Sequence, residues 1–131
     1  MKKALQNEAI AEALGWVKIH VEADEELPGR YGLEFDGWQT PTGSCVSWPP
    51  DCVDNPADLR KVEILLGLAD KTKLELRVKW INNLRSVVGR GMPKNKGGVA
   101  LVSDVDLLLA STSQRAEALI RTIGTWHQDE N

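Results

Sequence analysis

Apolar residues repeat at helical spacing in four parts of the chain. These stripes predict helices at residues 3–14, 56–69, 72–88 and 112–123. Gly15, Gly89 and Gly124 follow three of them, and glycine commonly ends a helix. Asn55 stands before a proline, and Ser111 stands three residues before a glutamine, so both are typical helix-capping residues.

Short strands are predicted between the helices. Residues 16–21 alternate apolar and polar side chains, which indicates a half-buried strand. Residues 31–35 fit a second strand, with Asp36 and Gly37 as a hairpin turn after it. Residues 99–102 fit a third, whereas residues 103–110 fit either a helix or a buried strand. We therefore expect one α+β domain over residues 1–131, with about four helices packed on a small, mostly antiparallel sheet.

Charge is concentrated in one stretch of this mildly acidic protein. Residues 71–98 contain eight basic residues and a single acidic one, Glu75, for a charge of +7. The rest of the chain contains eight basic and 18 acidic residues, for a charge of −10. The total of −3 argues against unselective coating of nucleic acid but permits a local anion-binding site. We call residues 71–98 the basic element.

The helix predicted within the basic element has an unusually wide apolar face. At 100° per residue its apolar side chains cover roughly 200°, more than one neighbour requires. The helix is therefore expected to contact neighbours on two sides, or one neighbour and a partner chain, which makes a homo-oligomer a candidate. Lys73, Arg77 and Arg85 fall inside this face. Each must form an ion pair, extend to the edge or meet an anionic ligand.

A glycine-rich basic loop, residues 89–98, follows the helix. It has four glycines with Arg90, Lys94 and Lys96. Glycines allow backbone N–H groups to approach a phosphate, but the loop matches neither the P-loop nor the dinucleotide fingerprint. It is either a solvated loop or an anion-binding loop. The candidate residues for an anion or a partner are Arg77, Arg85, Arg90, Lys94 and Lys96.

Two of the five tryptophans fall among Gly, Pro and Thr, in expected loops. Trp38 and Trp48 could stack on nucleic-acid bases or fill the core. They are the candidate stacking residues of a nucleic-acid site.

Catalytic and metal-binding patterns are not apparent in the sequence. Cys45 and Cys52 are expected to be free thiols rather than a disulfide, and no zinc-type spacing is present. No nucleophile motif occurs near a histidine, and Glu34 and Asp36 form a commonplace acidic pair. We expect a non-enzyme without a cofactor or metal.

No apolar run reaches the roughly 18 residues of a membrane span, and the N-terminus lacks an apolar signal core, which favours the cytosol.

Three segments resemble a group of small phage and prophage proteins. Residues 110–126 follow the pattern A-T-A-x-Q-R-A-E-A-h-h-R-T-h-G-K-W, where h is apolar, with Ser111, Ser113 and Thr125 departing from it. Residues 7–16 and 54–63 resemble the opening and the middle of the same group. The resemblance, over about a third of the chain, is to proteins of the phage α-β-α sandwich domain type. It implies a phage origin and an α+β fold, and it transfers no catalytic residue because these proteins have no assigned activity.

Two functions are consistent with these observations. The first is a phage-encoded binding protein in the host cytoplasm, acting in counter-defence, that binds a host protein or sequesters a small anionic ligand through the basic element. The second is a nucleic-acid-binding protein that uses the loop 89–98 and the loop tryptophans.

Overall fold

The computed structural model describes residues 1–22, 35–46, 49–124 and 126, and it confirms the predicted α+β class. These residues form five α-helices, a 3-10 turn and a three-stranded antiparallel sheet. The helices are α1 (Lys3–Ala13), α2 (Pro56–Leu65), α3 (Leu74–Val88), α4 (Asp104–Leu108) and α5 (Thr112–Thr122), and the 3-10 turn is η2 (Gly89–Gly91). The strands are β1 (Val17–Val21), β2 (Phe35–Gln39) and β3 (Cys45–Val46). No helix in these residues has both the length and the apolar character of a membrane span.

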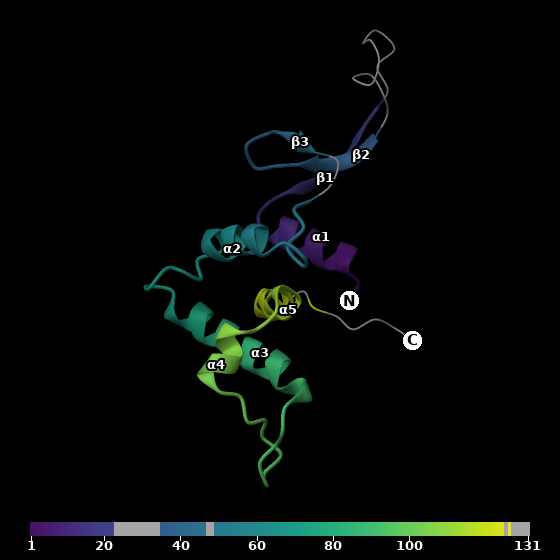
Figure 1. The fold of residues 1–131 in the computed structure, drawn as a ribbon. Coiled ribbons are helices and arrows are strands. Elements are labelled where there is room, and N and C mark those ends of the chain that lie inside the picture. Colours follow the sequence, from purple (N-terminus) through teal and green to yellow (C-terminus); the bar gives the residue numbers. More distant parts are fainter. Residues whose placement is uncertain (23–34, 47–48, 125, 127–131) are drawn as a thin grey trace.

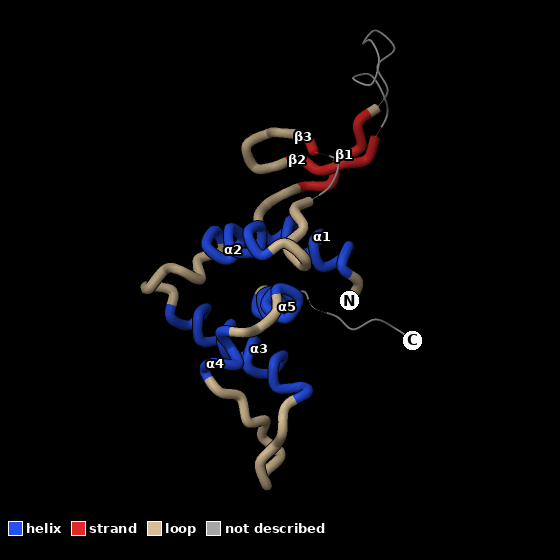
Figure 2. Tube along the Cα trace, in the orientation of Figure 1, coloured by secondary structure: helices blue, strands red, loops and turns tan. Residues whose placement is uncertain are grey.

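The elements are stacked along one direction, as Figures 1 and 2 show. The sheet lies at one end, next to α1 and α2, and α5 crosses the middle of the molecule. On the other side of α5 lie α3 and α4, and the loop after α3 extends to the far end. Because α5 contacts α1, α2 and α3, it connects the two helical layers.

Helix α5 owes this position to its sequence. Residues 116–120 of α5 are all buried, so the helix is covered on every side rather than along one stripe. One apolar cluster joins α5 to α1 and α2. Its buried members are Ala9, Ile10, Cys52, Val53, Leu59, Val62, Leu68, Ala116, Leu119 and Ile120. A second, smaller cluster joins α5 to α3 and contains Leu84, Val87, Val88 and Ala118.

The helix ends follow the predicted caps. Asn55 Oδ1 accepts hydrogen bonds from the backbone N–H of Ala57 and Asp58, at 3.0 and 3.3 Å. Ser111 and Gln114 form the predicted capping box at the start of α5. The ambiguous residues 103–110 form α4, where Ser103 makes a second capping box with Asp106. The hydrogen bonds of this capping box therefore favour the helix over the strand in that segment.

The sheet differs from the prediction at its turn. Asp36 and Gly37 are not a hairpin turn but lie inside β2, where they pair with His20 and Ile19 of β1. Only residue 35 of the predicted strand 31–35 is described. The strand predicted at residues 99–102 is also wrong, because that segment has only one bridge, between Lys94 and Ala100. An Asp-Gly pair forms a hairpin turn only where the segments before and after it pair with each other. Here both segments belong to β2, which pairs with β1 on one side and with β3 on the other.

Candidate functional site

The loop after α3 folds into a short hairpin, which we define as residues 93–101. The N–H of Leu101 donates to the carbonyl oxygen of Pro93 at 2.8 Å. The N–H of Asn95 donates to the carbonyl oxygen of Val99 at 2.9 Å. Lys94 and Ala100 form the antiparallel bridge between these two bonds. The basic loop therefore consists of the turn η2 followed by most of this hairpin, which is closed by one bridge.

Asn95 organises the tip of the hairpin. Its Oδ1 accepts from the N–H of Gly97 at 2.9 Å and from the N–H of Val99 at 3.0 Å. Its carbonyl accepts from the N–H of Gly98, whose φ of +78° is the left-handed conformation that glycine adopts readily. The N–H groups of the tip thus have partners within the hairpin. Asn95 thus engages the N–H groups of Gly97 and Gly98, so an anion at this loop would depend on the cationic side chains rather than on these two backbone groups.

Gly89 lets the hairpin pack against the end of α3. A Cβ on Gly89 would lie 2.8 Å from Cβ of Ala100 and 3.2 Å from Cγ2 of Val102. Real Cβ atoms rarely approach other atoms this closely, so only glycine allows the contact without displacement. The C-terminal end of α3 and the hairpin therefore form one packed unit.

A hollow of about 420 Å³ lies between α3 and the hairpin, and we call it the basic hollow. Its described lining residues are Asn82, Arg85, Ser86, Gly89, Arg90, Lys94, Gly98, Val99 and Ala100. Every charged residue among them is a cation. The structure thus brings together Arg85, Arg90 and Lys94, three of the five predicted residues. The other two do not line it: Arg77 lies two turns earlier on α3, and the exposed Lys96 lies at the hairpin tip.

Arg90 is held by a carboxylate outside the hollow. Its Nη1 donates to Oε1 of Glu117 at 2.8 Å, and its Nη2 donates to Oε2. Nε of Arg121 also donates to Oε2 of Glu117, at 2.7 Å. Burial would raise the pKa of the Glu117 carboxyl, but the two guanidinium groups outweigh burial and hold its pKa below the ordinary value. Arg90 therefore has a structural role, since it ties η2 to α5.

Arg85, Lys94 and Lys96 differ in their hydrogen bonds and ion pairs. Nη1 of Arg85 donates to the carbonyl of Val102 at 3.2 Å, and its Nη2 lies 4.0 Å from Oδ1 of the exposed Asp104. Lys94 and Lys96 are exposed and form no ion pair with the described residues. These two lysines are the best placed of the five candidates to meet an anion.

The predicted stacking residue Trp38 does not offer a ring face to a base. It lies in β2 rather than in a loop, and it is only 4% exposed. Nζ of Lys18 lies 5.5 Å from the centroid of its ring. The stacking prediction is therefore wrong for Trp38 in this conformation. Trp48 lies outside the described residues.

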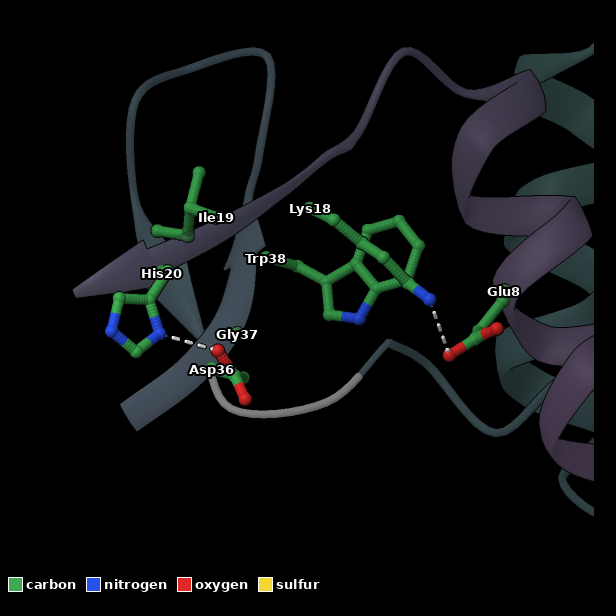
Figure 3. A pocket seen from close by; sticks show the side chains of 7 residues that line it. All are labelled: Glu8, Lys18, Ile19, His20, Asp36, Gly37 and Trp38. Carbon is green, nitrogen blue, oxygen red and sulfur yellow. Dashed lines mark hydrogen bonds and ion pairs between the residues drawn. The ribbon is translucent and has the colours of Figure 1, made fainter. Parts of the chain in front are cut away.

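A second hollow, of about 620 Å³, lies beside the sheet (Figure 3). His20 and Asp36 face each other across β1 and β2, with Nδ1 and Oδ1 2.6 Å apart. Lys18 reaches Glu8 of α1 at 3.2 Å. A histidine held by a carboxylate is the arrangement of a general base. The sequence analysis missed this pair, because it placed Asp36 in a turn, whereas the register of β1 and β2 makes it the direct neighbour of His20.

The two hollows differ in their charge balance. In the hollow beside the sheet, Lys18 has Glu8 as a partner and His20 has Asp36, as the dashed lines in Figure 3 show. In the basic hollow, the described lining residues include no carboxylate. An anion would gain more from the basic hollow, where Lys94 forms no ion pair with the described residues and Arg85 has only the distant Asp104.

The cysteines are free thiols, as the sequence predicts. Cys45 is exposed and Cys52 is buried. Burial, together with the nearby Asp58 and Asp51, raises the pKa of the Cys52 thiol to about 12. A thiol in this state is a poor nucleophile at neutral pH. The described residues contain no group of three or more His, Cys, Asp or Glu side chains placed to hold a metal ion.

Comparisons with protein-family models, with curated proteins and with solved structures find no match to this chain. The resemblance to small phage proteins therefore stays a prediction from the sequence.

Proposed function

We propose that the protein is a non-enzymatic binding protein that uses the basic element to bind an anionic group of its partner. The observation that carries the proposal is the basic hollow, where Arg85, Arg90 and Lys94 meet without a lining carboxylate among the described residues. The sequence resemblance extends the proposal to a phage protein, and we propose that it acts in counter-defence in the host cytoplasm. Its partner is a host protein or a small anionic ligand.

The size of the basic hollow limits what enters it. At about 420 Å³ it falls near the lower end of ligand-binding pockets, which leaves room for a phosphate or carboxylate together with part of the molecule that carries it. Arg85 and Lys94 supply charged donors, and Asn82 and Ser86 supply neutral polar groups beside them. Hydrogen bonds from charged donors are stronger than neutral ones, so the cations would provide most of the affinity.

Removing the two unpaired lysines is expected to abolish partner binding without unfolding the protein. Lys94→Ala with Lys96→Ala removes two exposed cations that form no ion pair with the described residues. Charged contacts are worth about 1.5–3 kcal/mol each, so the loss of two should lower affinity by about a hundredfold or more. The measurement is a tagged pull-down from host lysate, with and without nuclease, followed by mass spectrometry and titration of the retained partner.

The matched control is Lys2→Ala with Lys61→Ala, which makes the same change of charge at exposed lysines away from the hollow. It should bind as the wild type does. Arg90→Ala is unsuitable for this test, because it also breaks the ion pair with Glu117. Equal partner retention by the Lys94/Lys96 variant and the wild type would contradict the proposal. If no protein is retained, calorimetric titration with inorganic phosphate tests the small-ligand form.

Nucleic acid is the second candidate partner, and the shape of the hairpin favours considering it. A two-stranded ribbon can enter the major groove of DNA, and this hairpin, although closed by a single bridge, projects from the helices with exposed lysines at residues 94 and 96. Salt distinguishes the two functions. Neutralised phosphates release counterions, so affinity for nucleic acid should fall steeply between low and physiological salt. Retained proteins that vanish on nuclease treatment would favour this function, whereas one host protein that survives nuclease would favour the first.

A further inference from the structure

Half of the apolar face of α3 is open to solvent. Leu84, Val87 and Val88 are buried against α5 and α4, whereas Leu74 and Val78 are 65% and 50% exposed. The two exposed residues line a groove of about 480 Å³ together with Glu75, Lys79, Asn82 and Asn83. We call it the α3 groove. The wide apolar face predicted from the sequence is therefore covered on one side only by the described residues.

The charges in the α3 groove are opposite and unpaired. Glu75 is the single acidic residue of the basic element, and it lies in this groove. Lys79 follows one helical turn later on the same wall. Neither forms an ion pair or a side-chain hydrogen bond with the described residues. An apolar strip flanked by one acid and one base, each without an ion pair to the described residues, therefore lies on this surface.

This pattern is complementary to itself. In a two-fold dimer the same patch lies on both sides of the interface, so an acid and a base in the patch meet across the axis when the axis passes midway between them. If two copies of α3 pack antiparallel with the axis near Arg77 and Val78, Glu75 of one copy faces Lys79 of the other. The same arrangement brings the Leu74 and Val78 side chains of both copies together. We propose that the α3 groove binds a second copy of this chain in an antiparallel two-fold pair.

Charge favours a second copy over an acidic partner at this surface. An acidic partner would meet Glu75 in the α3 groove, whereas the basic hollow offers cations alone. The exposed Leu108 and Leu109 of the α4 segment are also apolar, but the charged residues of α4 are Asp104 and Asp106, so that surface is not self-complementary. One helix pair buries less than a standard protein interface, so the dimer is expected to be reversible and concentration-dependent.

Charge reversal tests the cross-axis pair. Glu75→Lys places like charges across the axis, and so does Lys79→Glu, so each variant alone should be monomeric at concentrations where the wild type dimerises. An equimolar mixture of the two variants restores both opposite-charge pairs and should form a heterodimer. Sedimentation velocity over a range of concentrations measures all four samples. A monomeric wild type, single variants that dimerise like the wild type, or a mixture that stays monomeric would each overturn the proposal.

A control variant separates the α3 groove from the other apolar surface. Leu108→Ser changes a side chain that is 83% exposed on α4, and it should leave the dimer unchanged. Loss of the dimer in Leu108→Ser would place the interface on α4 and overturn the assignment to the α3 groove. Circular dichroism of every variant checks that helix content is retained. The test involves neither Lys94 nor Lys96, so its outcome is independent of anion binding.

Discussion

Replacing Arg115 with methionine is expected to destabilise the fold by about 3–5 kcal/mol, because it leaves a carboxylate buried without its partner. Glu63 on α2 is 1% exposed, and its Oε1 accepts a hydrogen bond from Nη2 of Arg115 on α5. Its Oε2 is buried and has no hydrogen-bond partner in the described part of the chain. Domains of this size are commonly stable by about 5–15 kcal/mol, so the change would remove a large part of the stability.

The loss should depend on pH. Burial raises the pKa of the Glu63 carboxyl in the folded protein, although Arg115 opposes the shift. An acid with a raised pKa binds its proton more tightly when folded. Its contribution to stability is therefore complete below the unfolded pKa of about 4.3 and is lost as pH rises through the folded value. Without Arg115 the pKa rises further, so the free energy of unfolding of Arg115→Met should fall more steeply above about pH 4.3 than that of the wild type.

Chemical unfolding at several pH values measures both effects, and a double variant is the control. Glu63→Met with Arg115→Met removes both charges, and such replacements are often close to neutral in stability. The double variant should therefore be more stable than Arg115→Met alone and should lose the extra pH dependence. A single variant as stable as the wild type would contradict the prediction, because it would show that the Glu63 carboxyl does not depend on Arg115.

Much of the helical structure could be predicted because its signals are local. The caps at Asn55 and Ser111 act within one turn, and the glycines that end α1 and α5 act on their neighbours, with φ of +87° at Gly15 and +81° at Gly124. The start of α3 was predicted at residue 72 and lies at Leu74, a difference typical of helix ends. The sheet depends on pairing between distant segments. That is why Asp36 and Gly37 were misread as a turn.

The candidate site could be predicted only in part, for the same reason. Charge density along the chain identified the basic element, and three of its five candidates line one hollow. The partners of these cations lie far away in sequence, since Arg90 is paired with Glu117 and Arg115 with Glu63. No periodicity indicates such pairs. The packing centre of the molecule is α5, which only the contacts on both of its sides reveal.

The central position of α5 leads to the second large prediction, the effect of truncating Ile120. Ile120 is fully buried in the cluster that joins α5 to α1 and α2. Ile120→Ala removes three carbon atoms from this cluster and leaves a cavity, so the free energy of unfolding should fall by about 2–5 kcal/mol. Urea unfolding followed by tryptophan fluorescence measures the change. Leu108→Ala, at a residue exposed on α4, is the matched control and should change stability by about 0.5 kcal/mol or less.

The same experiment tests whether α5 joins the two helical layers. Trp80 packs against both apolar clusters, so it contributes a signal from both layers to the fluorescence of the five tryptophans, whereas circular dichroism reports on all the helices. If α5 supports both layers, the two signals should give one shared transition in the wild type and in Ile120→Ala, shifted to lower urea in the variant. Transitions that separate in the variant would mean that the α3–α4 layer unfolds independently. In that case the basic hollow and the α3 groove, which both lie on α3, would belong to a unit that Ile120 does not stabilise.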